Sequence, residues 1–248
     1  MTQTDPRQAL ELLLRNPALW RAEPAAQGLS QAVASGHAAL DAVLPQRGWP
    51  LGALTELLVG ATGIGELSLL APALGSLSAE GRHVALLAPP YLPQPRAWLQ
   101  AGIPLERLLI VEATSGDLLW SAEQLLRSGE CAAVVLWAEA AGRALDYRAL
   151  QRLQLAAANA KALCLLYRPL AAEAQPSPAP LRLRLAADAG RLQVQVLKCR
   201  GLAPAQPLTL QLFPPHWQAA ADALRVEPAR PVVVPASRFR HRLAAPAV

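Results

Sequence analysis

The feature that most restricts the fold is a regular alternation of apolar runs with helix-length segments between residues 53 and 167. The runs are apolar along their length, which is typical of parallel strands that are covered on both faces. The segments between them have the length and periodicity of connecting helices. The expected strands are 53–59, 83–89, 107–113, 131–138 and 161–167, and the expected helices are 66–81, 95–103, 116–129 and 146–160. The alternation predicts an α/β core with a mostly parallel sheet flanked by helices.

After residue 180 the pattern changes to an alternation of apolar with polar or basic residues. The stretches "LRLRLAAD" (181–188), "RLQVQVLKCR" (191–200) and "PLTLQLF" (207–213) follow this pattern. A period of two is typical of half-buried strands. We therefore expect an antiparallel meander that extends the parallel sheet at one edge.

The two ends of the chain lack a core-forming pattern. Residues 1–30 hold one short amphipathic helix followed by prolines, and we interpret them as a helical arm. Residues 216–248 are dominated by Pro, Ala and Arg, and we interpret them as a flexible basic tail. The α/β core then spans residues 31–215. Hydrophobic residues form 53% of the 248-residue chain, which suffices for such a core and excludes a largely disordered protein.

Composition also restricts the compartment and the partners. The chain opens without a signal-peptide pattern and has no apolar stretch near the ~20 residues that span a bilayer, so we expect a cytoplasmic protein. The net charge of +5 permits contact with nucleic acid or an acidic partner without requiring it. The cysteines are expected to be buried reduced thiols, and the tryptophans of the core to be packing residues. These are Cys131, Cys164 and Cys199, and Trp49, Trp98, Trp120 and Trp137.

A glycine loop, "GATGIG" (60–65), follows the first expected strand. Gly60 and Gly65 keep the spacing of a P-loop, in which backbone N–H groups cradle phosphates. A P-loop continues with a lysine that neutralises phosphate and a hydroxyl that holds magnesium, but Glu66 and Leu67 occupy these positions. A carboxylate repels polyphosphate, whereas a glutamate in the first turn of a helix is favoured by the helix dipole. We interpret the loop as a degenerate P-loop.

Other positions that would serve nucleotide chemistry are also changed. Trp137 stands at the strand end where an aspartate would help to hold magnesium, and it should be buried there. The strand at 83–89 ends in Pro89, followed by Pro90, where a carboxylate would activate water. Glu112 and Asp117 are interpreted as solvated caps rather than an acid–base pair. The sequence therefore predicts no catalytic residue, no cofactor and no metal.

These stretches together resemble the opening of the RecA recombinase core. They are more closely similar to the ImuA family, RecA-like proteins associated with inducible translesion DNA synthesis. This family is grouped with the SulA-type cell-division inhibitors, which share the degenerate fold. The resemblance covers residues 37–213 and is carried by "GWPLGALTELL", "GIGELSLL", "VALLAPPYLPQPRAWLQAGI", "LLIVEA", "LWSAEQLLRSG", "AVVLW" and "RALQRLQLAAANA". It implies a RecA-like α/β core.

The resemblance places individual residues on known positions of the RecA core. Gly60, Gly65 and Glu66 fall on the P-loop, with the lysine lost. Trp137 falls on the magnesium-binding aspartate, and Pro90 falls near the glutamate that activates water. The resemblance therefore implies that the nucleotide site is degenerate at several positions.

Two further positions concern contacts of RecA with neighbouring subunits and DNA. Lys198 and Arg200, in "LKCRG", fall on a strand whose basic residues reach the nucleotide of a neighbouring subunit, so they mark an ancestral inter-subunit surface. The stretch "PLAAEAQPSPAP" (169–180) replaces the glycine-rich DNA-binding loop. This replacement counts against filament-type DNA binding.

The resemblance implies a non-enzymatic accessory factor of SOS-inducible translesion synthesis and damage-induced mutagenesis. The first implied partner is ImuB, a Y-family polymerase-like protein, followed by RecA and an error-prone replicative-type polymerase. DNA is a weaker candidate, no membrane contact is expected, and the implied location is cytoplasmic and nucleoid-associated. A SulA-type inhibitor that binds FtsZ is the main alternative, and a DNA-binding recombinase paralogue is the second.

The basic tail is the segment in which we expect the partner contact. "PVVVP" is β-prone and "SRFRHRL" is basic with one phenylalanine, so the tail could add a strand to a partner or dock its aromatic ring. The alternative is a solvated end whose composition reflects a GC-rich genome. The candidate contact residues are Arg225, Arg230, Arg238, Phe239, Arg240 and Arg242.

Overall fold

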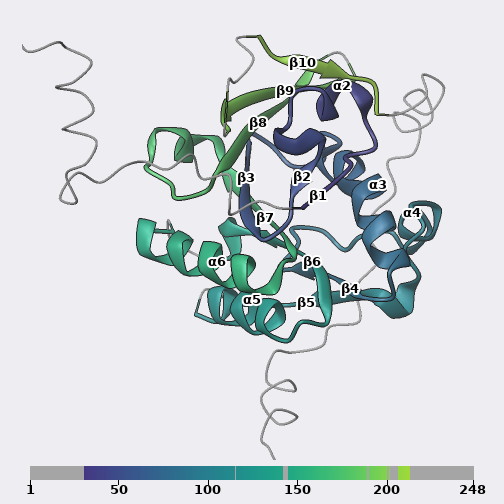
Figure 1. Cartoon of the computed structure of the whole chain (residues 1–248), viewed down its shortest axis with the longest axis vertical. Coiled ribbons are helices and arrows are strands. Elements are labelled where there is room, and N and C mark those ends of the chain that lie inside the picture. Colours follow the sequence, from purple (N-terminus) through teal and green to yellow (C-terminus); the bar gives the residue numbers. More distant parts are fainter. Residues whose placement is uncertain are drawn as a thin grey trace, which may run out of the picture. The chain divides into compact units, whose positions relative to one another are not determined.

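The computed structural model describes residues 31–114, 116–141, 145–188, 190–199, 201 and 206–212. The predicted arm and the whole of the predicted tail, with all six candidate contact residues, lie outside them. Within the described part, an eight-stranded sheet has the strand order β10-β9-β8-β3-β7-β6-β4-β5, and β1 and β2 form a separate two-stranded sheet. Figure 1 shows the arrangement.

The strands are β1 (Ala32–Val33), β2 (Trp49–Pro50), β3 (Ala53–Val59), β4 (His83–Leu87), β5 (Leu108–Val111), β6 (Cys131–Trp137), β7 (Leu163–Pro169), β8 (Leu181–Asp188), β9 (Arg191–Lys198) and β10 (Leu208–Leu210). The α-helices are α2 (Ala38–Asp41), α3 (Glu66–Ala79), α4 (Pro95–Gln100), α5 (Leu118–Arg127) and α6 (Tyr147–Ala160). Short 3-10 helices are η1 (Pro45–Arg47), η2 (Leu105–Arg107), η3 (Ala138–Ala141) and η4 (Leu170–Ala174).

The predicted elements of the core are confirmed in type and order. Strand β3 has the predicted bounds, and α3 ends two residues earlier than predicted, at Ala79. The two-residue strands β1 and β2 and the one-turn helix α2 were not predicted, because elements this short show no periodic pattern. The alternation of apolar runs and helical segments therefore predicted the elements of the core but not the short elements that precede β3.

The large sheet is parallel from β8 to β5 and antiparallel at its other edge. Strand β3 pairs in parallel with both β7 and β8, and β9 pairs antiparallel with both β8 and β10. The predicted mixed sheet with a meander at one edge is thus confirmed. One detail was wrong, because β8 joins the sheet through a parallel pairing before the antiparallel part begins.

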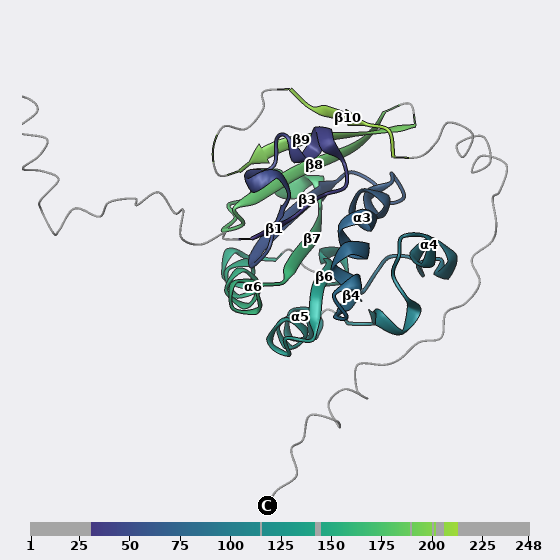
Figure 2. The same cartoon turned by 45° about the vertical axis from the view of Figure 1, so that its right-hand side comes forward.

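Helices cover both faces of the parallel part, with α3 on one face and α5 and α6 on the other (Figure 2). Leu57 of β3 belongs to the buried cluster on the α3 side, together with Leu70 of α3. Leu54, three residues earlier in the same strand, belongs to the cluster on the other side, together with Leu150 of α6. Every residue of β3 is buried, which explains why most of its residues are apolar and why they do not alternate with polar ones.

Burial confirms most of the predicted packing residues and corrects two. Trp49, Trp98 and Trp137 are buried, but Trp120 is 36% exposed because it lies on the outer side of α5. Cys199 follows β9 and is only partly buried. No helix of the described part is long and apolar enough to cross a membrane.

The other two cysteines lie inside strands. Burial raises the pKa of the thiol to about 11 for Cys131 and to about 12 for Cys164. Both thiols therefore stay protonated at neutral pH, which supports the interpretation of these residues as small core side chains.

A close backbone contact gives a test of the packing of α3. A Cβ added at Gly75 would lie 2.1 Å from the carbonyl oxygen of Ala101, the C-cap residue that follows α4. In an open helix Gly→Ala stabilises by about 1 kcal/mol, so the contact reverses the expected sign. We expect Gly75→Ala to lower the free energy of unfolding by about 1–3 kcal/mol, measured by denaturant unfolding.

The control for this variant is Gly116→Ala, where an added Cβ meets no atom within 4 Å. It should change the free energy of unfolding by less than about 0.5 kcal/mol. A Gly75→Ala protein as stable as the wild type would contradict the close approach of α3 to the end of α4.

Candidate functional site

The glycine loop connects the carboxyl end of β3 to the first turn of α3, as the sequence predicted. Gly63 and Gly65 have φ angles of 79° and 96°, in the left-handed region that favours glycine. Backbone in such conformations turns successive N–H groups toward one point and forms a concave site for an anion. The loop therefore depends on glycine at these two positions.

The carboxylate of Glu66 accepts the N–H groups of this loop. Gly63 N–H donates to Oε1 over 3.0 Å and Ile64 N–H donates to Oε2 over 2.9 Å. Glu66 is only 6% exposed. Hydrogen bonds from N–H groups to a carboxylate are charge-assisted and stronger than those between neutral groups. The sequence indicated only a favourable position in the helix dipole, whereas the structure shows the side chain folded back onto the loop as its anion.

Aromatic side chains pack beside this carboxylate. The Tyr167 hydroxyl donates to the main-chain carbonyl oxygen of Glu66 over 2.9 Å, and the Tyr167 ring stacks on Trp137 with centroids 5.0 Å apart. Burial, followed by the charge of Glu66, raises the pKa of Tyr167 well above its usual value, so the hydroxyl remains a donor. Trp137 is 3% exposed at the end of β6, which confirms its predicted burial at a strand end.

The remaining predicted positions are spread over the fold. Leu67 packs against the core on the α3 side, and Gly60 is exposed at the start of the loop. Pro90 is exposed in the turn after β4. Asp117 is the N-cap residue of α5, as predicted, while Glu112 is exposed just after β5. Among the predicted positions that the structure describes, Glu66 and Trp137 are linked through Tyr167, which bonds to the first and stacks on the second.

Lys198, the first residue of the predicted inter-subunit surface, contacts its own chain. It ends β9, and its Nζ donates to the carbonyl oxygen of Ser177 over 2.9 Å. Burial, followed by the charge of Arg182, lowers the pKa of Lys198. Arg200 lies outside the described residues.

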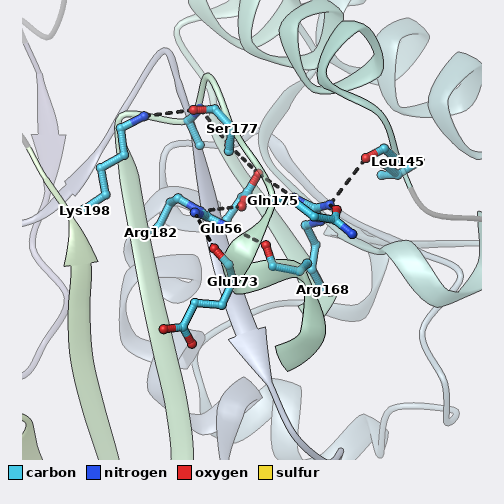
Figure 3. Close-up of polar contacts among 10 residues, drawn as sticks. Glu56, Leu145, Arg168, Glu173, Gln175, Ser177, Arg182 and Lys198 are labelled. Carbon is cyan, nitrogen blue, oxygen red and sulfur yellow. Dashed lines mark hydrogen bonds and ion pairs between the residues drawn. The ribbon is translucent and has the colours of Figure 1, made fainter.

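A second cluster of charged groups was not predicted (Figure 3). Glu56 lies in the middle of β3, is fully buried, and has its carboxylate between two guanidinium groups. Arg168 of β7 donates to Oε1 over 3.2 Å, and Arg182 of β8 donates to Oε2 over 2.9 Å. Ser177 adds a third donor, at 2.6 Å from Oε1. The pairing compensates a charge that would otherwise be very costly inside the sheet.

The same arginines hold the connection between β7 and β8. Arg182 donates to the carbonyl oxygens of Ala172 and Glu173 over 2.8 and 3.2 Å, and Arg168 donates to the side chain of Gln175 over 2.5 Å. Because β3 lies between β7 and β8 in the sheet, this connection crosses β3. Its hydrogen bonds to the Glu56 cluster fix it in place there.

Two sequence signals pointed to this cluster. Glu56 is the one charged residue of its strand, and a buried carboxylate requires a partner. The arginines of "LRLRL" were assigned to a half-buried face, yet Arg182 is only 8% exposed. The signal that was missed is the need of Glu56 for a cation on a neighbouring strand.

At both clusters the carboxylate is engaged in hydrogen bonds within the fold. Glu66 satisfies the glycine loop as an anion, and Glu56 joins three strands and a connection. No group of His, Cys, Asp and Glu in the described part is arranged to hold a metal ion.

Comparison of the chain with protein-family models and with curated proteins finds no match.

The buried cluster predicts a large effect of neutralising its carboxylate. Glu56→Gln leaves two buried guanidinium groups without their counter-charge, so we expect a loss of about 3–5 kcal/mol in the free energy of unfolding. The control is Glu80→Gln, which removes a surface pair with Arg82 at 3.5 Å and should cost less than about 0.5 kcal/mol. Similar losses for both variants in denaturant unfolding would contradict the central place of Glu56.

The burial of Trp137 gives an independent prediction. Trp137→Asp places a carboxylate in an apolar site against Tyr167 and should cost several kcal/mol, seen as a large fall in the melting temperature. Trp120→Asp is the matched control, because Trp120 is partly exposed in the first turn of α5, where an acidic residue is favoured. If both variants melt within a degree or two of the wild type, the site at the end of β6 is open to water.

Proposed function

We propose that this chain is a non-enzymatic, RecA-like accessory factor of SOS-inducible translesion DNA synthesis that acts through contacts with an ImuB-type polymerase-like protein. RecA and an error-prone replicative-type polymerase are further partners in this proposal. The single observation that carries it is the bonding of the glycine loop to Glu66. A glycine loop that is occupied by its own carboxylate has two of its N–H groups already bonded and not free for a nucleotide phosphate. The protein would then act by binding other proteins through its surface.

The sheet supports the RecA-like part of the proposal. The loop-bearing strand β3 lies at the centre of the sheet between β7 and β8, with β6, β4 and β5 beyond β7. In open α/β sheets, ligands bind at the carboxyl ends of strands where the strand order reverses, and the loop after β3 has this position. The position of the loop after β3 therefore supports the RecA-like part of the proposal.

The filled site supports the non-enzymatic part. Glu66 puts a negative charge where phosphate would bind, and a second negative group beside it would be repelled. The stacked rings of Trp137 and Tyr167 are buried next to it at the ends of β6 and β7, where the resemblance expects the magnesium-binding aspartate. Restoring a lysine at position 66 would leave the metal position filled.

The connection between β7 and β8 supports protein contacts over filament-type DNA binding. The resemblance places the DNA-binding loop of RecA in this connection. Here Arg182 donates to two carbonyl oxygens of the connection, and Arg168 donates to the side chain of Gln175 within it. A segment fixed in this way lacks the freedom of a glycine-rich loop to order on DNA.

The proposal is tested by capturing partners of the full-length chain from DNA-damaged cells and identifying them by mass spectrometry. We expect the ImuB-type protein and the bypass polymerase among the captured proteins. Recovery of FtsZ without the polymerases would contradict the proposal and favour the SulA-type alternative. Binding to DNA that weakens steeply with added salt would favour the recombinase paralogue.

Removing the end of the chain locates the partner contact. A chain that ends at Leu224 lacks all six candidate contact residues, and we expect it to keep its melting temperature within about 1 °C because no core-forming pattern is lost. It should fail to capture the polymerase-like protein in a two-protein pull-down. Capture at full strength would instead assign the contact to the α/β core or to residues 1–30.

A further inference from the structure

We propose that Glu66 is a built-in anion, which holds the glycine loop in its ligand-bound form and conceals a site for a tetrahedral oxyanion such as phosphate. A neutral, shorter side chain at position 66 would reopen that site. The inference deepens the proposed function. It rests on that function only in explaining why a permanently occupied loop would be useful to the protein.

The contacts of the carboxylate are those that a phosphate makes in such a loop. Each of its two oxygens accepts one N–H, from Gly63 or Ile64, at 3.0 and 2.9 Å. Phosphate groups at the start of a helix likewise accept backbone N–H groups and are favoured by the helix dipole. The helix here is α3, which runs from Glu66 to Ala79 and is long enough to contribute a dipole. The carboxylate therefore stands in for an oxyanion in both its charge and its contacts.

The main chain at position 66 is held independently of the carboxylate. Tyr167 donates to the carbonyl oxygen of Glu66, and Trp137 stacks on the Tyr167 ring. Removing the side chain at position 66 leaves both contacts in place. The two N–H groups would then lose their acceptor while their positions are maintained, and an unsatisfied N–H group is costly.

The loop is open to solvent at Gly63, one of the two residues that donate to the carboxylate. A Cβ built on Gly63 meets no atom within 4 Å, and Gly63 is exposed. Substituting Glu66 by alanine would add the space that its side chain now fills. Inorganic phosphate and pyrophosphate are thus suitable probes of the reopened site.

The built-in anion has a consequence for partner binding. A ligand shifts a conformational equilibrium only when it binds one state better than the other. A loop that is already occupied gives nucleotide no such preference, so the surfaces next to the loop stay the same whatever the nucleotide level. Partner capture by the wild-type chain should therefore be equal with and without ATP.

The test compares the wild type, Glu66→Ala and Glu106→Ala in thermal melts, in phosphate-free buffer and with ionic strength held constant by sodium chloride. Glu106 is exposed in η2, so its variant removes the same charge away from the loop. We expect Glu66→Ala to melt about 5 °C or more below the wild type. Phosphate or pyrophosphate should then raise its melting temperature saturably, because a ligand that binds only the folded state stabilises it.

The other two proteins should respond to the same additions weakly and equally. An equal response from all three proteins would overturn the inference. Partner capture by the wild type is measured separately, so its failure would count against the proposed function while leaving the melting result to decide the inference.

Amide hydrogen exchange in the wild type tests the inference without any variant. The N–H groups of Gly63 and Ile64 should exchange about tenfold or more slowly than those of Gly60 and Ala61 in the same loop. In Glu66→Gln, which keeps the length of the side chain, exchange at Gly63 and Ile64 should accelerate. Exchange in the wild type that is equally fast at all four positions would overturn the inference.

Discussion

The constraint that shapes this protein is the burial of two carboxylates beside the central strand of an apolar sheet. Glu56 lies within β3, and Glu66 follows the loop that β3 leads into. An unpaired carboxylate in such a place would cost many kcal/mol, so the surrounding structure has to supply donors. Glu56 receives them from two arginines and a serine, whereas Glu66 receives them from backbone N–H groups.

Strand β7 contributes a side chain to the surroundings of each carboxylate. Successive residues of a strand point to opposite faces of the sheet. Tyr167 accordingly bonds to Glu66 on the α3 face, and Arg168 bonds to Glu56 on the opposite face. The glycine loop and the connection between β7 and β8 are thus both held by neighbouring residues of one strand. This arrangement holds both connections at the carboxyl end of the sheet in place, as the proposed action through protein contacts requires.

The sequence predicted the layers of the core well, because buried parallel strands and amphipathic helices leave strong patterns. It also predicted the place of the glycine loop between β3 and α3 and the burial of Trp137. It could not predict where the Glu66 carboxylate goes, since that depends on loop angles at Gly63 and Gly65 that no periodicity encodes. The partners of Glu56 were missed for a different reason, because pairing residues more than a hundred positions apart requires the strand order.

The most direct measurement of the central claim is titration calorimetry of the full-length chain with ATP and magnesium. With Glu66 bonded to the glycine loop and Trp137 buried beside Tyr167, the account predicts no binding heat from the wild type. It predicts no ATP hydrolysis from Glu66→Lys either, because the metal position stays filled. Micromolar binding of ATP by the wild type would contradict the account.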